Sequence, residues 1–193
     1  MYYPILRGRQ NELLALKELL KGNALSDKII PVIEPVKLSP TLVNSLNAFV
    51  EKHRNIILIR NLQVGSFNVD ARNPKNDKYY ENFKTVISNN EIIRGLIIDK
   101  STPSKIKEWR SKGVDDSDIV AICDNPDAIK YFEAAFENKS GVKTIVPYAS
   151  AFRRIRTGRI LLEDKFNKKA RNQDYEDDSA LSQNLCKPQM CSR

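Results

Sequence analysis

The sequence predicts an α/β fold, an incomplete (β/α)8 TIM-barrel-like domain with about seven parallel strands. Strand-like runs alternate with amphipathic helical segments along the whole chain, and no hairpin turn interrupts the alternation. Several of the strand-like runs are apolar throughout, as in parallel strands that are covered on both faces. The alternative is an open, doubly wound parallel sheet, but the regular spacing of the runs favours the barrel.

The expected strands are short apolar runs bounded by polar or turn-forming residues. They comprise residues 3–6, 29–33, 56–59, 95–98, 119–123, 142–146 and 159–162. Pro31 weakens the second strand slightly because proline has no N–H group to donate to a neighbouring strand.

Helices are expected between these strands. Residues 11–21 carry leucines mostly on one helical face, and Gly22 and Asn23 are a suitable helix end. Ser39 and Pro40 are typical of a helix start, with serine as the cap and proline in the first turn. Three further helices are expected, at about residues 78–88, after Thr102-Pro103 and after Pro126. Residues 61–77 are expected to form a long functional or disordered loop.

Composition predicts a single cytoplasmic domain. The 193 residues contain no apolar run long enough to cross a membrane and no secretory signal. Of the three cysteines, Cys123 lies in an apolar run and is expected to be buried, and the others match no zinc pattern. The net charge of +8 favours partners that carry phosphate, although lysine-rich surfaces also simply keep proteins soluble.

The end of the chain differs from the rest. Residues 179–193 show no periodicity and hold two of the three cysteines and one of the two methionines. We expect residues 1–178 to form the barrel-like domain and residues 179–193 to be a disordered or frame-shifted tail. A complete barrel takes about 250 residues, so we interpret the chain as a truncated copy. Truncation would leave a sheet edge open for self-association.

Residues 3–13 (YPILRGRQNEL), 30–36 (IPVIEPV), 166–172 (FNKKARN) and 174–175 (DY) resemble the phage beta-protein-like family of mostly uncharacterised bacterial and phage proteins. The resemblance implies a single barrel-like domain, usually longer than this chain. It also implies a role in phage defence beside a nuclease-like protein encoded nearby. It carries over no catalytic residue.

In a parallel barrel, functional groups collect at the carboxyl ends of the strands. The candidate catalytic carboxylates at these positions are Glu34, Asp99, Asp124, Glu163 and Asp164, and the candidate anion-binding arginines are Arg7, Arg9 and Arg60. Carboxylates around one opening can hold Mg²⁺ or divide acid and base roles. Asp99 and Asp124 have an alternative role as caps, and Asn125 is another possible cap for the helix that Pro126 opens. No helix begins beside Glu34.

A basic segment near the end is the other candidate site. Its predicted nucleic-acid-binding residues are Arg153, Arg154, Arg156, Lys168, Lys169 and Arg171, interleaved with Phe152, Phe166 and Tyr175. Basic residues with interleaved aromatics are typical of a groove for a nucleic-acid backbone. The alternative is a solvated face balanced by the acidic residues from 174 to 178.

The leading functional hypothesis is a component of a bacterial defence or mobile-element module, with metal-assisted hydrolysis of a phosphate-containing substrate. One alternative is a non-catalytic subunit that binds nucleic acid or a nuclease partner. The other is an inactive truncated fragment.

Overall fold

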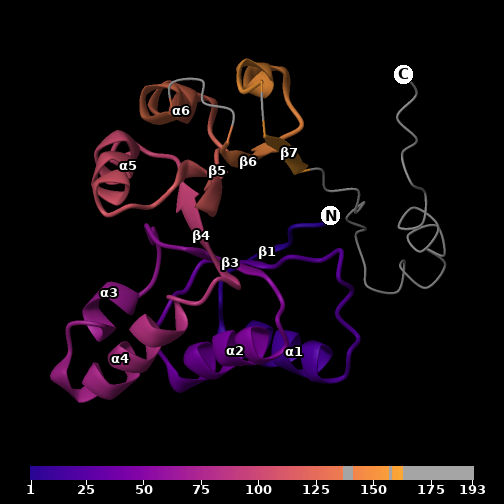
Figure 1. Ribbon diagram of the computed structural model, residues 1–193, viewed down its shortest axis with the longest axis vertical. Helices are drawn as coiled ribbons and strands as arrows, with labels where there is room; N and C mark the ends of the chain where they lie inside the picture. Colours follow the sequence, from indigo (N-terminus) through magenta and orange to yellow (C-terminus); the bar gives the residue numbers. More distant parts are fainter. Residues whose placement is uncertain (137–140, 157, 163–193) are drawn as a thin grey trace, which may run out of the picture. The chain divides into compact units, whose positions relative to one another are not determined.

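A computed structural model of the chain describes residues 1–136, 141–156 and 158–162 (Figure 1). These residues belong to one compact unit, Met1–Leu162. The domain boundary predicted at residue 178 and the tail beyond it lie outside the described residues. No helix among the described residues is long and apolar enough to span a membrane.

A single sheet of seven parallel strands forms the centre of the unit, and the strands follow one another in chain order. They are β1 (Ile5–Leu6), β2 (Val32–Ile33), β3 (Ile56–Ile59), β4 (Ile92–Ile97), β5 (Ile119–Ile122), β6 (Lys143–Pro147) and β7 (Arg159–Leu162). A doubly wound sheet reverses its strand order at a switch point, and this sheet does not. The sheet curls as half of a barrel, which confirms the predicted incomplete TIM-barrel-like fold.

The strands differ from the prediction mainly at their ends. β2 is shorter than expected and begins only after Pro31, because proline has no N–H group to donate to a neighbouring strand. The carbonyl oxygen of Pro31 still accepts a hydrogen bond from the Ile57 N–H at 2.8 Å, and the Val32 N–H donates to the Pro4 oxygen at 2.8 Å. β4 begins three residues earlier than predicted, at Ile92.

The helices lie between the strands in sequence. They are α1 (Gln10–Lys21), α2 (Pro40–Glu51), α3 (Phe67–Asp70), α4 (Asp77–Val86), α5 (Thr102–Ser111) and α6 (Ile129–Phe136), with the 3-10 turns η1 (Pro74–Asn76), η2 (Asp116–Asp118), η3 (Pro126–Ala128) and η4 (Ser150–Arg154). Ser39 caps α2 as predicted, its hydroxyl accepting the Leu42 N–H at 3.2 Å. The segment predicted as a long loop contains α3 and η1. Phe67 anchors α3 by burying its ring edge-on against Phe83.

The curled sheet has two faces with separate cores. In β3, Ile56 and Leu58 pack with α1, α2 and α4, whereas Ile57 and Ile59 pack with residues of β2 and β5 on the opposite face. The helix-covered face is itself divided into one core under α1, α2 and α4 and another under α5 and α6.

Candidate functional site

Glu34, directly after β2, is buried and fully engaged. Its carboxylate accepts a hydrogen bond from the Arg7 guanidinium and another, at 3.0 Å, from the backbone N–H of Gln63. Glu34 is 3% exposed, whereas the Arg7 side chain is about half exposed. Arg7 follows β1 and Gln63 follows β3, so one carboxylate joins three loops at the carboxyl ends of three neighbouring strands. The prediction that Arg7 and Glu34 converge agrees with this geometry.

Two glycines permit this convergence. Gly8 has a positive φ of 61°, and a Cβ there would lie 2.9 Å from a methyl group of Ile33. Gly65 has φ of 86°, and its Cβ would lie 2.1 Å from the Val36 carbonyl oxygen. Only glycine tolerates both the conformation and the contact. The loop after β3 is thereby held against the loop after β2, where the Gln63 N–H reaches Glu34.

Arg9 lies in a different environment from Arg7, at the rim of a cleft of about 520 Å³ beside the starts of α1 and α2. The cleft also contains Lys37, Asp70 and Tyr79. The Asp70 carboxylate accepts hydrogen bonds from the Ser66 hydroxyl at 2.9 Å and from the Leu38 N–H at 3.3 Å. The cleft therefore has mixed charge, and Asp70 within it is already used by the fold.

Asn61 joins the ends of β3 and β4. Its side-chain amide donates to the Ile97 carbonyl oxygen at 2.6 Å and to the Asp99 carboxylate at 3.2 Å, and its oxygen accepts the Ile97 N–H at 2.8 Å. The Asn61 side chain is buried, with 8% exposure. It makes with the Ile97 backbone the two hydrogen bonds that one more residue of β3 would otherwise make. Sequence reasoning did not single out Asn61 for this role.

Asp99 organises the turn that leads into α5. Its carboxylate accepts hydrogen bonds from the Ser101 N–H at 2.8 Å and the Ser101 hydroxyl at 2.6 Å. Burial opposes ionisation of Asp99, but hydrogen bonds from Ser101 and Asn61 and the charge of Lys105 outweigh it and lower its pKa. The contacts of Asp99 agree with the capping role, which was one of its two predicted roles.

Asp124 is exposed, and no described residue donates a hydrogen bond to its carboxylate. The side chain of Asn125, not that of Asp124, caps η3 by accepting the Asp127 N–H at 2.9 Å. Of the two residues predicted as possible caps before Pro126, Asn125 is therefore the cap, and the expectation of a capping role for Asp124 is wrong. Cys123 is fully buried as predicted, and burial and the Asp124 charge raise its pKa to about 11.

Arg60 is not at the opening with Arg7. It projects from the helix-covered face of β3, where its Nη2 donates to the Ile87 carbonyl oxygen at 3.2 Å. There it lines a cleft between α4 and α5 that also contains Arg94, Lys84 and Lys105. Sequence reasoning missed Arg94 because the strand was predicted to begin at Gly95, whereas β4 includes Arg94 and turns its side chain toward the helices.

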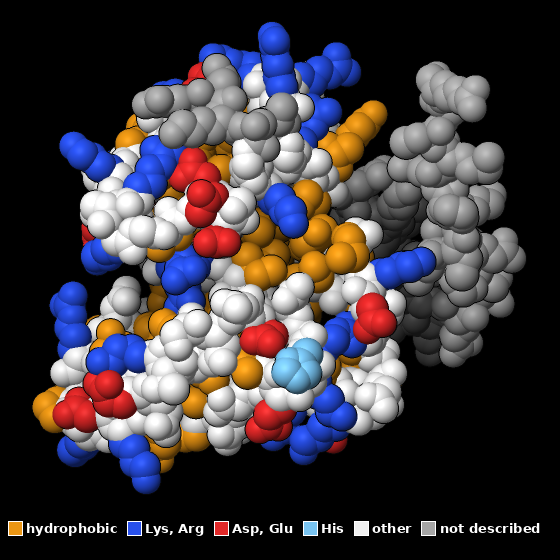
Figure 2. All heavy atoms as spheres, in the orientation of Figure 1, with side chains coloured by type: hydrophobic (Ala, Val, Ile, Leu, Met, Phe, Trp, Pro, Cys, Tyr) orange, Lys and Arg blue, Asp and Glu red, His pale blue; other side chains and the backbone are white. Residues whose placement is uncertain are grey.

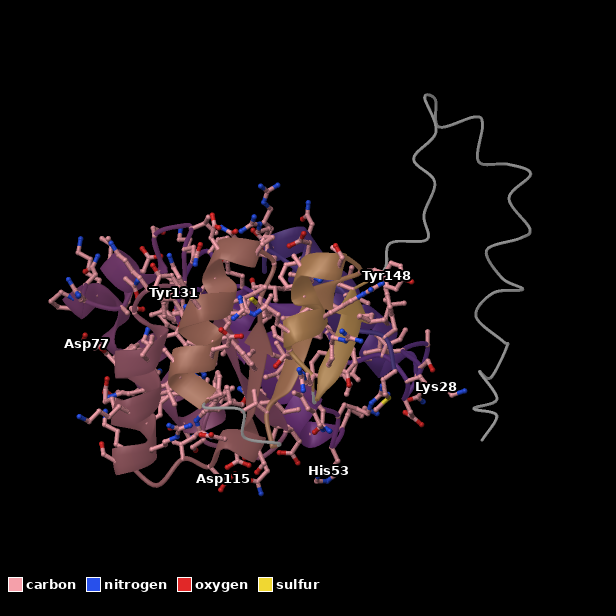
Figure 3. All side chains as sticks on the ribbon, turned by 90° about the horizontal axis from the view of Figure 1, so that it is seen from above. Lys28, His53, Asp77, Asp115, Tyr131 and Tyr148 are labelled. Atoms are coloured by element: carbon pink, nitrogen blue, oxygen red, sulfur yellow. The ribbon has the colours of Figure 1, made fainter. Side chains whose placement is uncertain are left out.

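The predicted basic segment is described as far as residue 162. Arg153 and Arg156 are exposed, whereas Arg154 is held by Glu133 at 2.8 Å. Phe152, expected as a stacking platform, is 2% exposed and belongs to the core, so that expectation is wrong. Tyr148 is the exposed aromatic side chain here, at 75%, and lies at the surface beside η4 and β7 (Figure 3). Lysine and arginine side chains gather over this region, at the top of Figure 2.

The remaining predicted site residues, Glu163, Asp164, Lys168, Lys169 and Arg171, lie outside the described residues. Among the residues that are described, no three acidic, histidine or cysteine side chains come together in a way that would hold a metal ion. The predicted hydrolytic activity and the Mg²⁺ that would assist it remain predictions. The contacts seen for Glu34 and Asp99 are contacts that stabilise loops.

Comparison of the chain with protein-family models, curated proteins and solved structures finds no match.

Proposed function

We propose that this protein is a non-catalytic subunit that binds single-stranded nucleic acid at the surface formed by Tyr148, η4 and β7. The observation that supports this proposal is a small cavity of about 120 Å³ lined by Tyr148, Ser150, Arg153 and Arg159. Arginines bind phosphate through paired hydrogen bonds, and a serine hydroxyl adds another donor. An exposed tyrosine ring offers a face on which an unpaired base can stack.

The charges around the cavity favour a backbone ligand. No described carboxylate forms an ion pair with Arg153 or Arg159, so both guanidinium groups are available to an anion. Arg154 is instead neutralised by Glu133. We therefore expect Arg153 and Arg159 to contribute more to the affinity for nucleic acid than Arg154 does, although Arg154 lies in the middle of the predicted basic segment. The resemblance to the phage beta-protein-like family makes a phage-defence module, with a nuclease-like partner, the proposed cytoplasmic setting.

The test is fluorescence anisotropy with a labelled single-stranded DNA oligonucleotide at salt concentrations from about 50 to about 200 mM. Binding should weaken with salt. The double variant R153A/R159A should bind more weakly, and its salt dependence should be shallower by about 1.4 in log–log slope, because each lost phosphate contact removes about 0.7. The control, K75A/K78A, removes the same charge from exposed positions in η1 and α4.

Absence of binding at the lowest salt would overturn the proposal. So would equal losses in the two double variants, because the contribution would then come from net charge and not from this surface. Competition with duplex DNA separates the two forms of nucleic acid. Preference for the single strand supports a role for Tyr148 stacking, and preference for the duplex contradicts it.

A further inference from the structure

The layer of helices on the outer face of the sheet is interrupted between α4 and α5. The helices α1, α2 and α4 pack side by side over one part of the sheet, and α5 packs with α6 over another. Between the two groups, above β3 and β4, lies a cleft of about 410 Å³. The separation of α4 from α5 is visible at the left of Figure 1, and blue side chains border the corresponding hollow in Figure 2.

Two arginines from neighbouring strands form the floor of this cleft. Arg94 of β4 is paired in register with Leu58 of β3, and Arg60 lies two residues beyond Leu58. Alternate residues of a strand share a face, so both arginines project toward the cleft. Arg60 and Arg94 are each half-buried. Two like charges are thus held in a site that is partly removed from water.

Neither of these arginines has a carboxylate partner among the described residues. Elsewhere in the same unit, Arg54 pairs with Asp27 at 3.0 Å and Arg110 pairs with Asp116 at 2.6 Å. Burial, and then the charge of Arg94, lower the pKa of Arg60 to about 10, which still leaves it charged at neutral pH. A half-buried charge without a counter-charge is unfavourable, so an anion bound here would stabilise the folded chain.

The rim of the cleft adds further positive charge. Lys84 from α4 and Lys105 from α5 line it together with Glu108. The Glu108 carboxylate is already occupied by Lys112 at 2.5 Å, on the same helix. Lys84 is itself paired with Glu81 at 2.6 Å, so Arg60, Arg94 and Lys105 are the cationic side chains of the cleft that form no ion pair with a described residue. Trp109 contributes an apolar wall beside these charges.

We propose that the cleft between α4 and α5 is a second, independent binding site, which takes a small polyphosphate anion of the size of a nucleotide. Its volume lies in the range of ligand pockets, about 300–1,000 Å³. Adjacent guanidinium groups suit adjacent phosphoryl groups, because each can donate two parallel hydrogen bonds. The Trp109 ring would lie beside the base of a nucleoside diphosphate. A small ligand is favoured over a polymer because the arginines lie at the floor of the cleft.

The single tryptophan of the chain makes the proposal directly testable. Because Trp109 lines the cleft, its fluorescence should change on titration with pyrophosphate or ADP at constant ionic strength. R60M and R94M should each weaken binding of both ligands at least tenfold. The control K107Q removes one charge from an exposed position of α5 outside the cleft and should bind as the unmodified protein does. R153A/R159A should also bind normally.

Thermal unfolding provides a second readout that does not depend on fluorescence. Pyrophosphate should raise the melting temperature of the unmodified chain and of K107Q, but not that of R94M. Without ligand, R94M should melt at the same temperature or higher, because it relieves repulsion between two half-buried charges. A lower melting temperature for R94M without ligand would assign Arg94 a structural role and overturn the proposal.

A comparison of ADP with pyrophosphate identifies the class of ligand. Tighter binding of ADP than of pyrophosphate supports a nucleotide with its base against Trp109, and equal binding assigns the site to the phosphates alone. No response to either ligand overturns the proposal. Loss of oligonucleotide binding in R94M would also overturn it, because the cleft would then be part of the nucleic-acid surface and not a separate site.

Discussion

The Glu34 carboxylate and the Arg7 guanidinium form an ion pair that joins the loop after β2 to the loop after β1. Glu34 is buried and Arg7 is not, so the pair anchors a solvent-facing arginine to an interior carboxylate. The same carboxylate also accepts the Gln63 N–H. An acidic group with these partners stabilises the arrangement of loops, whether or not it also contacts a ligand.

R7A should destabilise the protein by about 1–3 kcal/mol, because it leaves a buried carboxylate with a single hydrogen bond. E34Q should cost less, since its side-chain oxygen can still accept the Gln63 N–H. Urea unfolding measures both variants. As a control, R9A removes an exposed arginine from the same loop. A loss in R9A equal to that in R7A would show that the ion pair contributes nothing specific.

N61A should be more damaging than the position of Asn61 in a loop would indicate, because the side chain is buried. The substitution leaves both the N–H and the carbonyl oxygen of Ile97 without their partner, at a cost of about 2–4 kcal/mol. Chemical denaturation with N90A as the control checks this value, since Asn90 is exposed. Equal stability of the two variants would contradict the proposed role of Asn61 in joining β3 to β4.

The lowered pKa of Asp99 predicts the direction in which the stability of the protein changes with pH. This pKa is lower in the folded protein than in the unfolded chain, where aspartate has a pKa of about 3.9. The folded state therefore binds fewer protons, and the stabilisation by Asp99 is fully present above that value and is lost as the pH falls below it. The difference in unfolding free energy between the unmodified protein and D99N should therefore shrink as the pH falls below about 3.9, the pKa of aspartate in the unfolded chain. A constant difference would contradict it.

The Cys123 thiol should resist alkylation in the folded protein. It is fully buried, and its pKa is raised to about 11, so little thiolate forms at pH 8. In a C186S/C191S background Cys123 is the sole thiol of the chain. Mass spectrometry after iodoacetamide treatment should show rapid modification in denaturant and slow modification without it. Similar rates under both conditions would mean that β5 opens readily.

Tyr148 should contribute to nucleic-acid binding through its ring and not through its hydroxyl. Y148A should weaken binding of a single-stranded oligonucleotide by about 1–3 kcal/mol, the usual contribution of one stacked base. Y148F should bind normally, because the ring is retained. Y79A is the matched control, since Tyr79 is also partly exposed but lies on α4. Weakened binding in Y148F would point to a hydrogen bond in place of stacking.

Local sequence patterns predicted much of the fold. Short apolar runs between amphipathic helices predicted the parallel sheet, and the structure confirms all seven strands with shifts at their ends. The helix start predicted at Ser39-Pro40 is also confirmed. A capping hydroxyl and the fixed φ of proline determine a helix start through residues that are close in sequence, so the sequence alone reveals it. The convergence of Arg7 with Glu34 followed from the shared direction of neighbouring strands.

Tertiary structure alone decided toward which face of the sheet each side chain points. The run from Ile56 to Ile59 is apolar at every position, so it lacks the alternation that would reveal whether Arg60 points toward the helices or away from them. Pairing with β4 sets that direction and places Arg60 beside Arg94. Likewise, burial of Phe152 and exposure of Tyr148 depend on how η4 packs on the core, which no local pattern encodes.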